Sequence, residues 1–133
     1  MEEGNQSLSA GIKGKVSEKV TEDKTAVHVG SGTQMVYATP ALSALMEKTA
    51  YMSVIDLLES GTCSVGSRTV LDHIAPTPLG SAVTCETELV KVDRRHLTFS
   101  FTVRDGAGEI ARGTHERVIV DIERFLGKAS GRL

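Results

Sequence analysis

The sequence has 133 residues, of which 40% are hydrophobic and 24% charged, and these proportions are typical of one globular domain. Fifteen Lys and Arg against seventeen Asp and Glu give a net charge of −2, and no basic tract could neutralise a run of phosphates, so nucleic-acid binding is not expected. No apolar run is long enough for a membrane span, and the acidic N-terminus is unlike a signal peptide. The two cysteines form neither a disulfide framework nor a CxxC unit, so we expect reduced thiols in a cytoplasmic protein.

The first third of the chain contains its strongest helix signal. Residues 1–10 are polar and are expected to be flexible, which leaves a single domain over 11–133. Residues 13–22 are typical of a short strand, and the Gly/Ser-rich segment 28–34 predicts a loop. Thr39 then suits a helix N-cap and Pro40 the first helical position. No breaker follows until Gly61, so a helix of about 20 residues is predicted.

After Gly61 the hydrophobic period changes from helical to alternating. Strands are predicted at 63–71, 81–92, 97–103 and 109–123. They are joined by short turns, among them a proline-containing turn and an Asp-Gly hairpin. This order predicts an α+β protein in which an antiparallel sheet wraps around one long central helix, the hotdog architecture. Such a sheet has exposed edges, so pairing of two copies is expected.

Glu47 is a carboxylate within an apolar stripe of the predicted helix. The residues within roughly 60° of it on a helical wheel are Pro40, Ala44, Tyr51, Val54 and Leu58. The polar residues on the far side are Thr49, Ser53, Asp56 and Ser60. Glu47 is therefore either a groove-edge glutamate that turns towards water or an arginine, or a partly buried acid or base. We favour the second interpretation.

Thr39 and His73 are the other candidates for chemistry. Helix capping alone explains Thr39, but a hydroxyl at a helix N-terminus also lies where N–H groups favour developing negative charge. His73 follows a predicted strand and precedes the proline turn, a common place for catalytic side chains. His115 carries no independent signal. No histidine pair has a metal-binding spacing, so no metal site is predicted.

Several sequence blocks resemble the fluoroacetyl-CoA thioesterase group of hotdog proteins. The blocks are VYATP at 36–40, LME at 45–47, Gly66, HIAPTPLG at 73–80, GTHER at 113–117 and IERF at 122–125. The resemblance implies that Thr39, Glu47 and His73 cooperate in hydrolysing an acyl-CoA thioester. It also implies that Gly66 and Arg117 position the acyl end of the substrate. A homodimer with active sites at the subunit interface is implied as well.

The resemblance leads to a small acyl-CoA as the expected substrate, with coenzyme A as part of the substrate and no separate cofactor. Glu47 would act as nucleophile or as base for water, and His73 would move protons. Thr39 would orient Glu47 or polarise the thioester oxygen. The family's fluoroacetyl-specific member carries a longer, Phe-bearing lid ahead of the threonine. This chain has only the short segment 28–35 there and no Phe before Phe99, so selectivity for fluoroacetyl is not expected.

Two other functions fit the same architecture. One is a hydratase or dehydratase of enoyl thioesters, although its usual Asp and His motif is absent. The other is an acyl-CoA-binding protein that keeps the groove without catalysis. Detection of a free thiol on turnover distinguishes hydrolysis from both.

Overall fold

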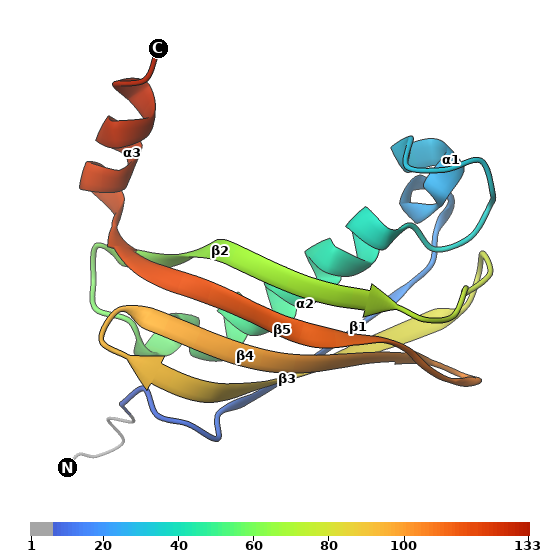
Figure 1. The fold of residues 1–133 in the computed structure, drawn as a ribbon, viewed down its shortest axis with the longest axis horizontal. Helices are drawn as coiled ribbons and strands as arrows, with labels where there is room; N and C mark the ends of the chain where they lie inside the picture. The colour runs from blue at the N-terminus through green and yellow to red at the C-terminus, as the bar shows by residue number, and fades with distance from the viewer. Residues whose placement is uncertain (1–6) are drawn as a thin grey trace.

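The computed structural model describes residues 7–133, which form one antiparallel sheet and one long helix (Figure 1). The strands are β1 (Lys13–Lys19), β2 (Thr62–His73), β3 (Ala82–Asp93), β4 (His96–Asp105) and β5 (Gly108–Asp121). The helices are the 3₁₀ turns η1 (Glu22–Lys24) and η2 (Ile55–Leu57) and the α-helices α1 (Ala26–Val29), α2 (Thr39–Val54) and α3 (Ile122–Ser130). Most of the predicted flexible segment, residues 1–10, lies outside the described residues. Within the described part, every helix is too short or too polar to cross a membrane.

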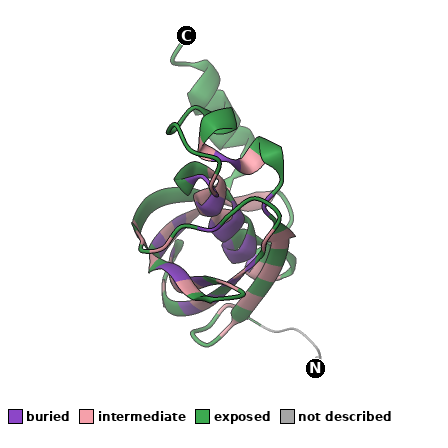
Figure 2. Ribbon diagram, turned by 90° about the vertical axis from the view of Figure 1, so that its right-hand side faces the viewer, coloured by how far each residue is buried: buried purple, intermediate pink, exposed green. Residues whose placement is uncertain are grey.

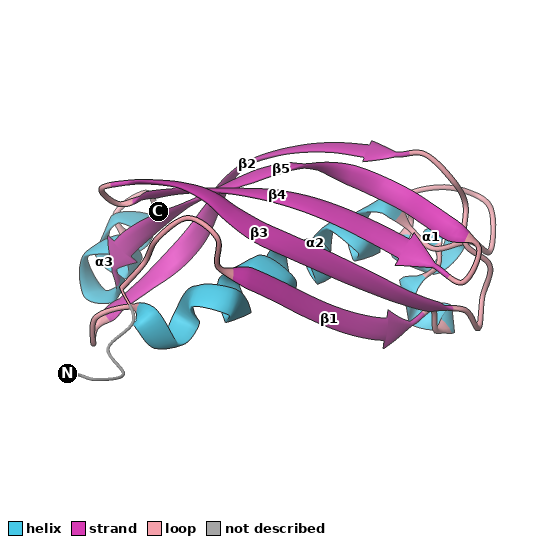
Figure 3. Cartoon of the chain, turned by 90° about the horizontal axis from the view of Figure 1, so that it is seen from below, coloured by secondary structure: helices cyan, strands magenta, loops and turns pink. Residues whose placement is uncertain are grey.

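The five strands lie in the order β1-β3-β4-β5-β2, and every neighbouring pair is antiparallel. Helix α2 runs along one face of this sheet (Figure 3). Seen end-on, the strands curve around the buried side of the helix (Figure 2). The predicted α+β hotdog architecture is therefore confirmed. The two edge strands are β1 and β2, and β2 is the longer of them.

Helix α2 packs on the sheet through one side. Its buried residues recur at helical spacing and are Leu42, Leu45, Met46, Thr49, Ala50 and Val54. Thr49 lies on the side of the helix away from Glu47, as predicted. It is 1% exposed and donates to the Leu45 carbonyl at 2.7 Å, so this side packs in the core although it carries polar residues. The helix is also shorter than predicted, because it continues beyond Val54 only as the 3₁₀ turn η2.

The strand predictions agree closely with the structure in the centre of the sheet. In β4 the inward side chains are buried, as their alternation predicted: Leu97, Phe99, Phe101 and Val103. The last predicted strand ends early, since β5 stops at Asp121 and α3 follows. Asp121 caps α3 by accepting from the Arg124 backbone N–H at 3.0 Å. The residues of α3 are intermediate or exposed, and the helix projects from the end of β5 (Figure 1).

A bulge in β2 sets which of its side chains face α2. Opposite residues of an antiparallel pair share a face. Gly66 pairs with Arg117, whereas Thr69 pairs with His115, so the register shifts by one residue between them. Because of this extra residue, Gly66 and His73 lie on the same face of the sheet, although an uninterrupted strand would place them on opposite faces.

Candidate functional site

Thr39 and His73 form a hydrogen-bonded pair at one end of α2. The Thr39 Oγ1 lies 2.8 Å from His73 Nδ1. Thr39 is the first residue of α2, its N-cap is Ala38, and no side chain caps this end. The prediction that Thr39 is the N-cap is therefore wrong. The Thr39 hydroxyl, which was expected to cap the backbone N–H groups of the helix, instead contacts the imidazole of His73.

The environment of His73 keeps its imidazole neutral. Burial lowers the pKa of His73 from its usual value of 6.5. Within residues 7–133 its Nε2 atom is buried and has no hydrogen-bond partner. A neutral imidazole beside a hydroxyl can accept a proton at one nitrogen and deliver one from the other. The pair also lines a groove of about 330 Å³, together with Tyr37, Ala38 and Ala75.

Glu47 lies two turns further along α2 and faces β2. Its side chain is half-buried, and its Oε2 lies close to Gly66. A Cβ atom built on Gly66 would stand 3.2 Å from Glu47 Oε2, which is tighter than most real contacts. Glycine at this position therefore lets the carboxylate approach the strand. The fold thus brings together Glu47 and Gly66, two of the predicted site residues.

Arg117 lies opposite Gly66 on β5, and several contacts hold its guanidinium. Arg117 is 7% exposed. Its Nε donates to Ser64 Oγ at 2.8 Å, and its Nη2 donates to the Ser64 carbonyl at 2.8 Å. The guanidinium carbon is 5.7 Å from the centre of the Tyr51 ring. Burial lowers the pKa of Arg117, and the Glu47 carboxylate opposes this shift.

A second hollow lies beside Arg117. It measures about 270 Å³. Its lining residues come from α2, the turn after it, β2 and β5: Tyr51, Ile55, Leu58, Cys63, Ser64 and Arg117. The lining is mostly apolar and carries one fixed cation, an arrangement suited to a small ligand with one polar end.

His115 is the residue that sequence reasoning missed. It is 1% exposed and pairs with Thr69 of β2. Its Nε2 lies 3.1 Å from Arg117 Nη1. The available signal was its spacing of two from Arg117, which places both side chains on one face of a strand. Alone, that alternation does not tell a buried face from an exposed one.

The predicted catalytic and substrate-binding residues thus fall into two groups within one chain. Thr39 and His73 form the first, and Glu47, Gly66 and Arg117 form the second. Thr39 and Glu47 are eight residues apart along α2, a rise of roughly 12 Å. No hydrogen bond joins the two groups in the described chain. Thr39 therefore does not orient Glu47 directly within one copy.

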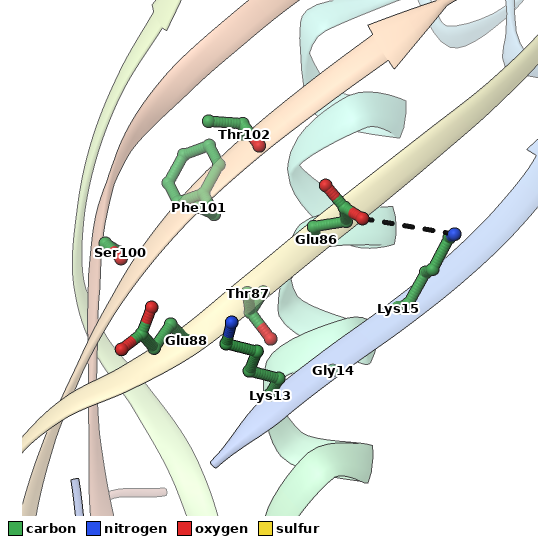
Figure 4. Close-up of a pocket in the computed structure, with 9 residues that line it drawn as sticks. All are labelled: Lys13, Gly14, Lys15, Glu86, Thr87, Glu88, Ser100, Phe101 and Thr102. Carbon is green, nitrogen blue, oxygen red and sulfur yellow. Dashed lines mark ion pairs between the residues drawn. The ribbon is translucent and has the colours of Figure 1, made fainter. Parts of the chain in front are cut away.

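A third hollow, of about 490 Å³, lies over β1, β3 and β4 (Figure 4). Its rim alternates in charge, and Lys15 Nζ is 4.0 Å from Glu86 Oε2. The positive and negative side chains of this hollow largely neutralise one another. None of the predicted site residues lines it. Among residues 7–133, no cluster of three or more His, Cys, Asp or Glu side chains could hold a metal ion.

Comparisons with known proteins agree on one family. The family described as fluoroacetyl-CoA-specific thioesterase matches residues 20–123. A fluoroacetyl-CoA thioesterase from Streptantibioticus cattleyicolor is 38% identical over 93 residues, which cover 70% of this chain and 67% of that protein. A solved fluoroacetyl-CoA thioesterase structure superposes with a TM-score of 0.92 at 30% identity, covering 96% of this chain and 99% of the other.

A hot-dog-like protein from Thermanaerovibrio acidaminovorans also superposes, with a TM-score of 0.85 and 25% identity over 93% of this chain and 92% of that one. Together these matches confirm the predicted hotdog fold and the predicted enzyme class, a thioester hydrolase. The resemblance seen in the sequence blocks is confirmed too, since the matched region spans nearly all of them. The chain belongs to the fluoroacetyl-CoA-specific thioesterase family.

Proposed function

We propose that this protein hydrolyses a small acyl-CoA thioester to the free acid and coenzyme A. The observation that carries the proposal is the convergence of Glu47 and Arg117 on Gly66. A carboxylate able to attack or to activate water lies there beside a fixed donor for the acyl end of a substrate. Coenzyme A is part of the substrate, so the proposal needs no separate cofactor.

In the proposed reaction a water oxygen forms a bond to the acyl carbon and the carbon–sulfur bond breaks. Glu47 serves either as base for that water or as nucleophile, giving an acyl-enzyme that water then hydrolyses. The proton that the attacking water gives up reaches the departing thiolate through His73, whose neutral imidazole accepts it at Nε2 and then donates it to the sulfur. Thr39 positions the imidazole through its 2.8 Å contact and polarises the thioester oxygen. Gly66 and Arg117 bind the acyl end.

We propose further that the active unit is a homodimer joined through β2. The outer edge of β2 pairs with no described strand. Exposed apolar side chains flank this edge: Tyr51, Ile55, Val70 and Ile74. When two β2 strands pair antiparallel about their middle, the C-terminal half of each strand lies beside the N-terminal half of the other. The Thr39–His73 pair of one copy then approaches Glu47 and Arg117 of the other, which joins the two groups that one chain keeps apart.

Mixing two inactive variants tests this shared site. Glu47→Gln and His73→Gln are each expected to abolish most turnover, and both should sediment as dimers at micromolar concentration. After subunit exchange, half of the dimers are mixed, and each mixed dimer keeps one intact site if the two residues act across the interface. We therefore expect about a quarter of wild-type activity to return. A monomeric mass, or exchange without recovered activity, would contradict the shared site.

Thr39 is expected to act through its hydroxyl. Thr39→Val keeps the shape of the side chain and removes the contact to His73, so kcat/KM should fall at least about tenfold. Because the residue is exposed and caps nothing, the free energy of unfolding should change by less than about 0.5 kcal/mol. Thr39→Ser, which retains a hydroxyl, is the control and should keep most activity. Equal rates for the Val and Ser variants would remove Thr39 from the site.

A panel of acyl-CoA substrates with a thiol-detecting dye tests the function itself. Release of free thiol from acetyl-, fluoroacetyl- or propionyl-CoA is the expected result. Loss of enoyl absorbance from crotonyl-CoA without thiol would indicate a hydratase, and binding without turnover would indicate a sensor. No Phe occurs before Phe99, so we expect fluoroacetyl- and acetyl-CoA to differ by less than about tenfold in kcat/KM.

We place this activity in the cytoplasm. The two cysteines, Cys63 and Cys85, are both free thiols, which suits a reducing compartment. Burial raises the pKa of Cys85 to about 11, so its thiol is neutral and belongs to the core.

A further inference from the structure

His115 has a defined tautomer because of what surrounds its ring. Its Nδ1 lies 3.1 Å from the Arg68 carbonyl oxygen and 2.7 Å from Thr69 Oγ1. A carbonyl oxygen only accepts, so Nδ1 carries the hydrogen. Burial, and next the positive charge of Arg117, lower the pKa of His115, so the ring is neutral at neutral pH. The other nitrogen, Nε2, therefore presents a lone pair.

That lone pair faces the guanidinium of Arg117. A guanidinium has donors only, so Nη1 of Arg117 donates to His115 Nε2 across 3.1 Å. Ser64 accepts from Nε and Nη2 on the opposite side. Hydrogen bonds to Ser64 on β2 and to His115 on β5 thus hold the Arg117 guanidinium. One N–H of Nη1 and one of Nη2 remain for a ligand.

Glu47 lies at the same place as His115 and Arg117, next to Gly66. A Cβ on Gly66 would lie 3.2 Å from Glu47 Oε2, 3.2 Å from His115 Cε1 and 3.5 Å from Arg117 Nη1. The ring edge of His115 therefore borders the space in which carboxylate and guanidinium meet. A side chain at position 115 that offered no acceptor would leave Nη1 of the buried Arg117 guanidinium without its hydrogen-bond partner.

We propose that His115 is a positioning residue that acts through Arg117, holding the guanidinium beside Glu47 so that its remaining N–H groups meet the acyl end of the thioester. The inference rests on the proposed function for its catalytic consequence. The His115–Arg117 contact itself does not depend on which substrate is hydrolysed.

Two substitutions separate this role from packing alone. His115→Leu fills similar space without an acceptor, and kcat/KM is expected to fall at least about tenfold. His115→Gln offers an amide oxygen to Arg117 and should return kcat/KM to within about threefold of wild type. In the Arg117→Gln background, His115→Leu should cause no further loss, because the residue through which it acts is gone. Losses that multiply in the double variant, or a Leu variant as active as wild type, would overturn the proposal.

A spectroscopic measurement on the unmodified protein keeps the inference testable if the Leu variant does not fold. Long-range ¹H–¹⁵N spectra at neutral pH should show a neutral His115 ring with hydrogen on Nδ1 and none on Nε2. Hydrogen on Nε2 would contradict the contact with Arg117. If wild-type protein released no thiol from any acyl-CoA, the proposed function would fail, while this spectrum would still decide the His115–Arg117 contact.

Discussion

Glu47→Gln is expected to lower kcat by at least about 100-fold while the protein remains folded. Glutamine keeps the volume of the side chain and removes the charge that either attacks the thioester or takes a proton from water. The side chain is half-buried and faces Gly66 and Arg117, so the change reaches the proposed reaction without opening the core. Turnover of acetyl-CoA, followed by thiol release at saturating substrate, measures the effect.

Glu86→Gln is the matched control for this substitution. Glu86 is exposed on the face of the sheet away from α2. Its ion pairs with described residues are long, 4.0 Å to Lys15 Nζ (Figure 4) and 3.8 Å to Arg104 Nη2. We expect its kcat to stay within about twofold of wild type, since exposed ion pairs contribute little. If Glu47→Gln and Glu86→Gln turned over equally fast, Glu47 would be only a glutamate at the edge of the groove.

Gly113→Ala is expected to have the largest effect on stability, a loss of more than about 3 kcal/mol in the free energy of unfolding. A Cβ on Gly113 would overlap the carbonyl oxygen of Val70 in β2 and stand 3.0 Å from Phe101 Cζ in the core. One neighbour is backbone and the other is a buried ring, so neither can move away cheaply. The pairing of β2 with β5 would be forced apart.

Urea unfolding measures this loss, and Gly106→Ala is its control. A Cβ on Gly106 meets nothing within 4 Å, so that variant should unfold within about 0.5 kcal/mol of wild type. A midpoint for Gly113→Ala close to that of Gly106→Ala would show that β2 and β5 can separate without cost. Because β2 carries both Gly66 and His73, activity should fall together with stability.

The sequence by itself determined the elements and the family. The alternation around Leu97 to Val103 predicted β4, because one face of a strand must be apolar to pack on a helix. The absence of a breaker after Pro40 predicted α2. The sequence blocks with their spacing predicted the hotdog fold and the thioesterase family, and these are confirmed. The roles of Thr39, Glu47 and His73 remain predictions.

Only the tertiary structure decided which side of α2 packs on the sheet. The helix is apolar on more than one side, and local periodicity does not choose between stripes that both contain apolar residues. Packing placed Thr49 in the core and left Glu47 half-buried on the opposite side of the helix. The missed helix α3 begins at Ile122, within the stretch that was assigned to the last strand, because Asp121 caps it there.

The composition of the site was likewise decided by long-range pairing. Counting by twos along the sequence places Gly66 and His73 on opposite faces, yet the bulge between Gly66 and Arg68 puts them on the same one. The pairing of β2 with β5 then brings Arg117 to Gly66 and buries His115 beside it. A one-residue change of register alters every side chain that follows, and that register depends on partners about 50 residues away rather than on neighbours in the chain.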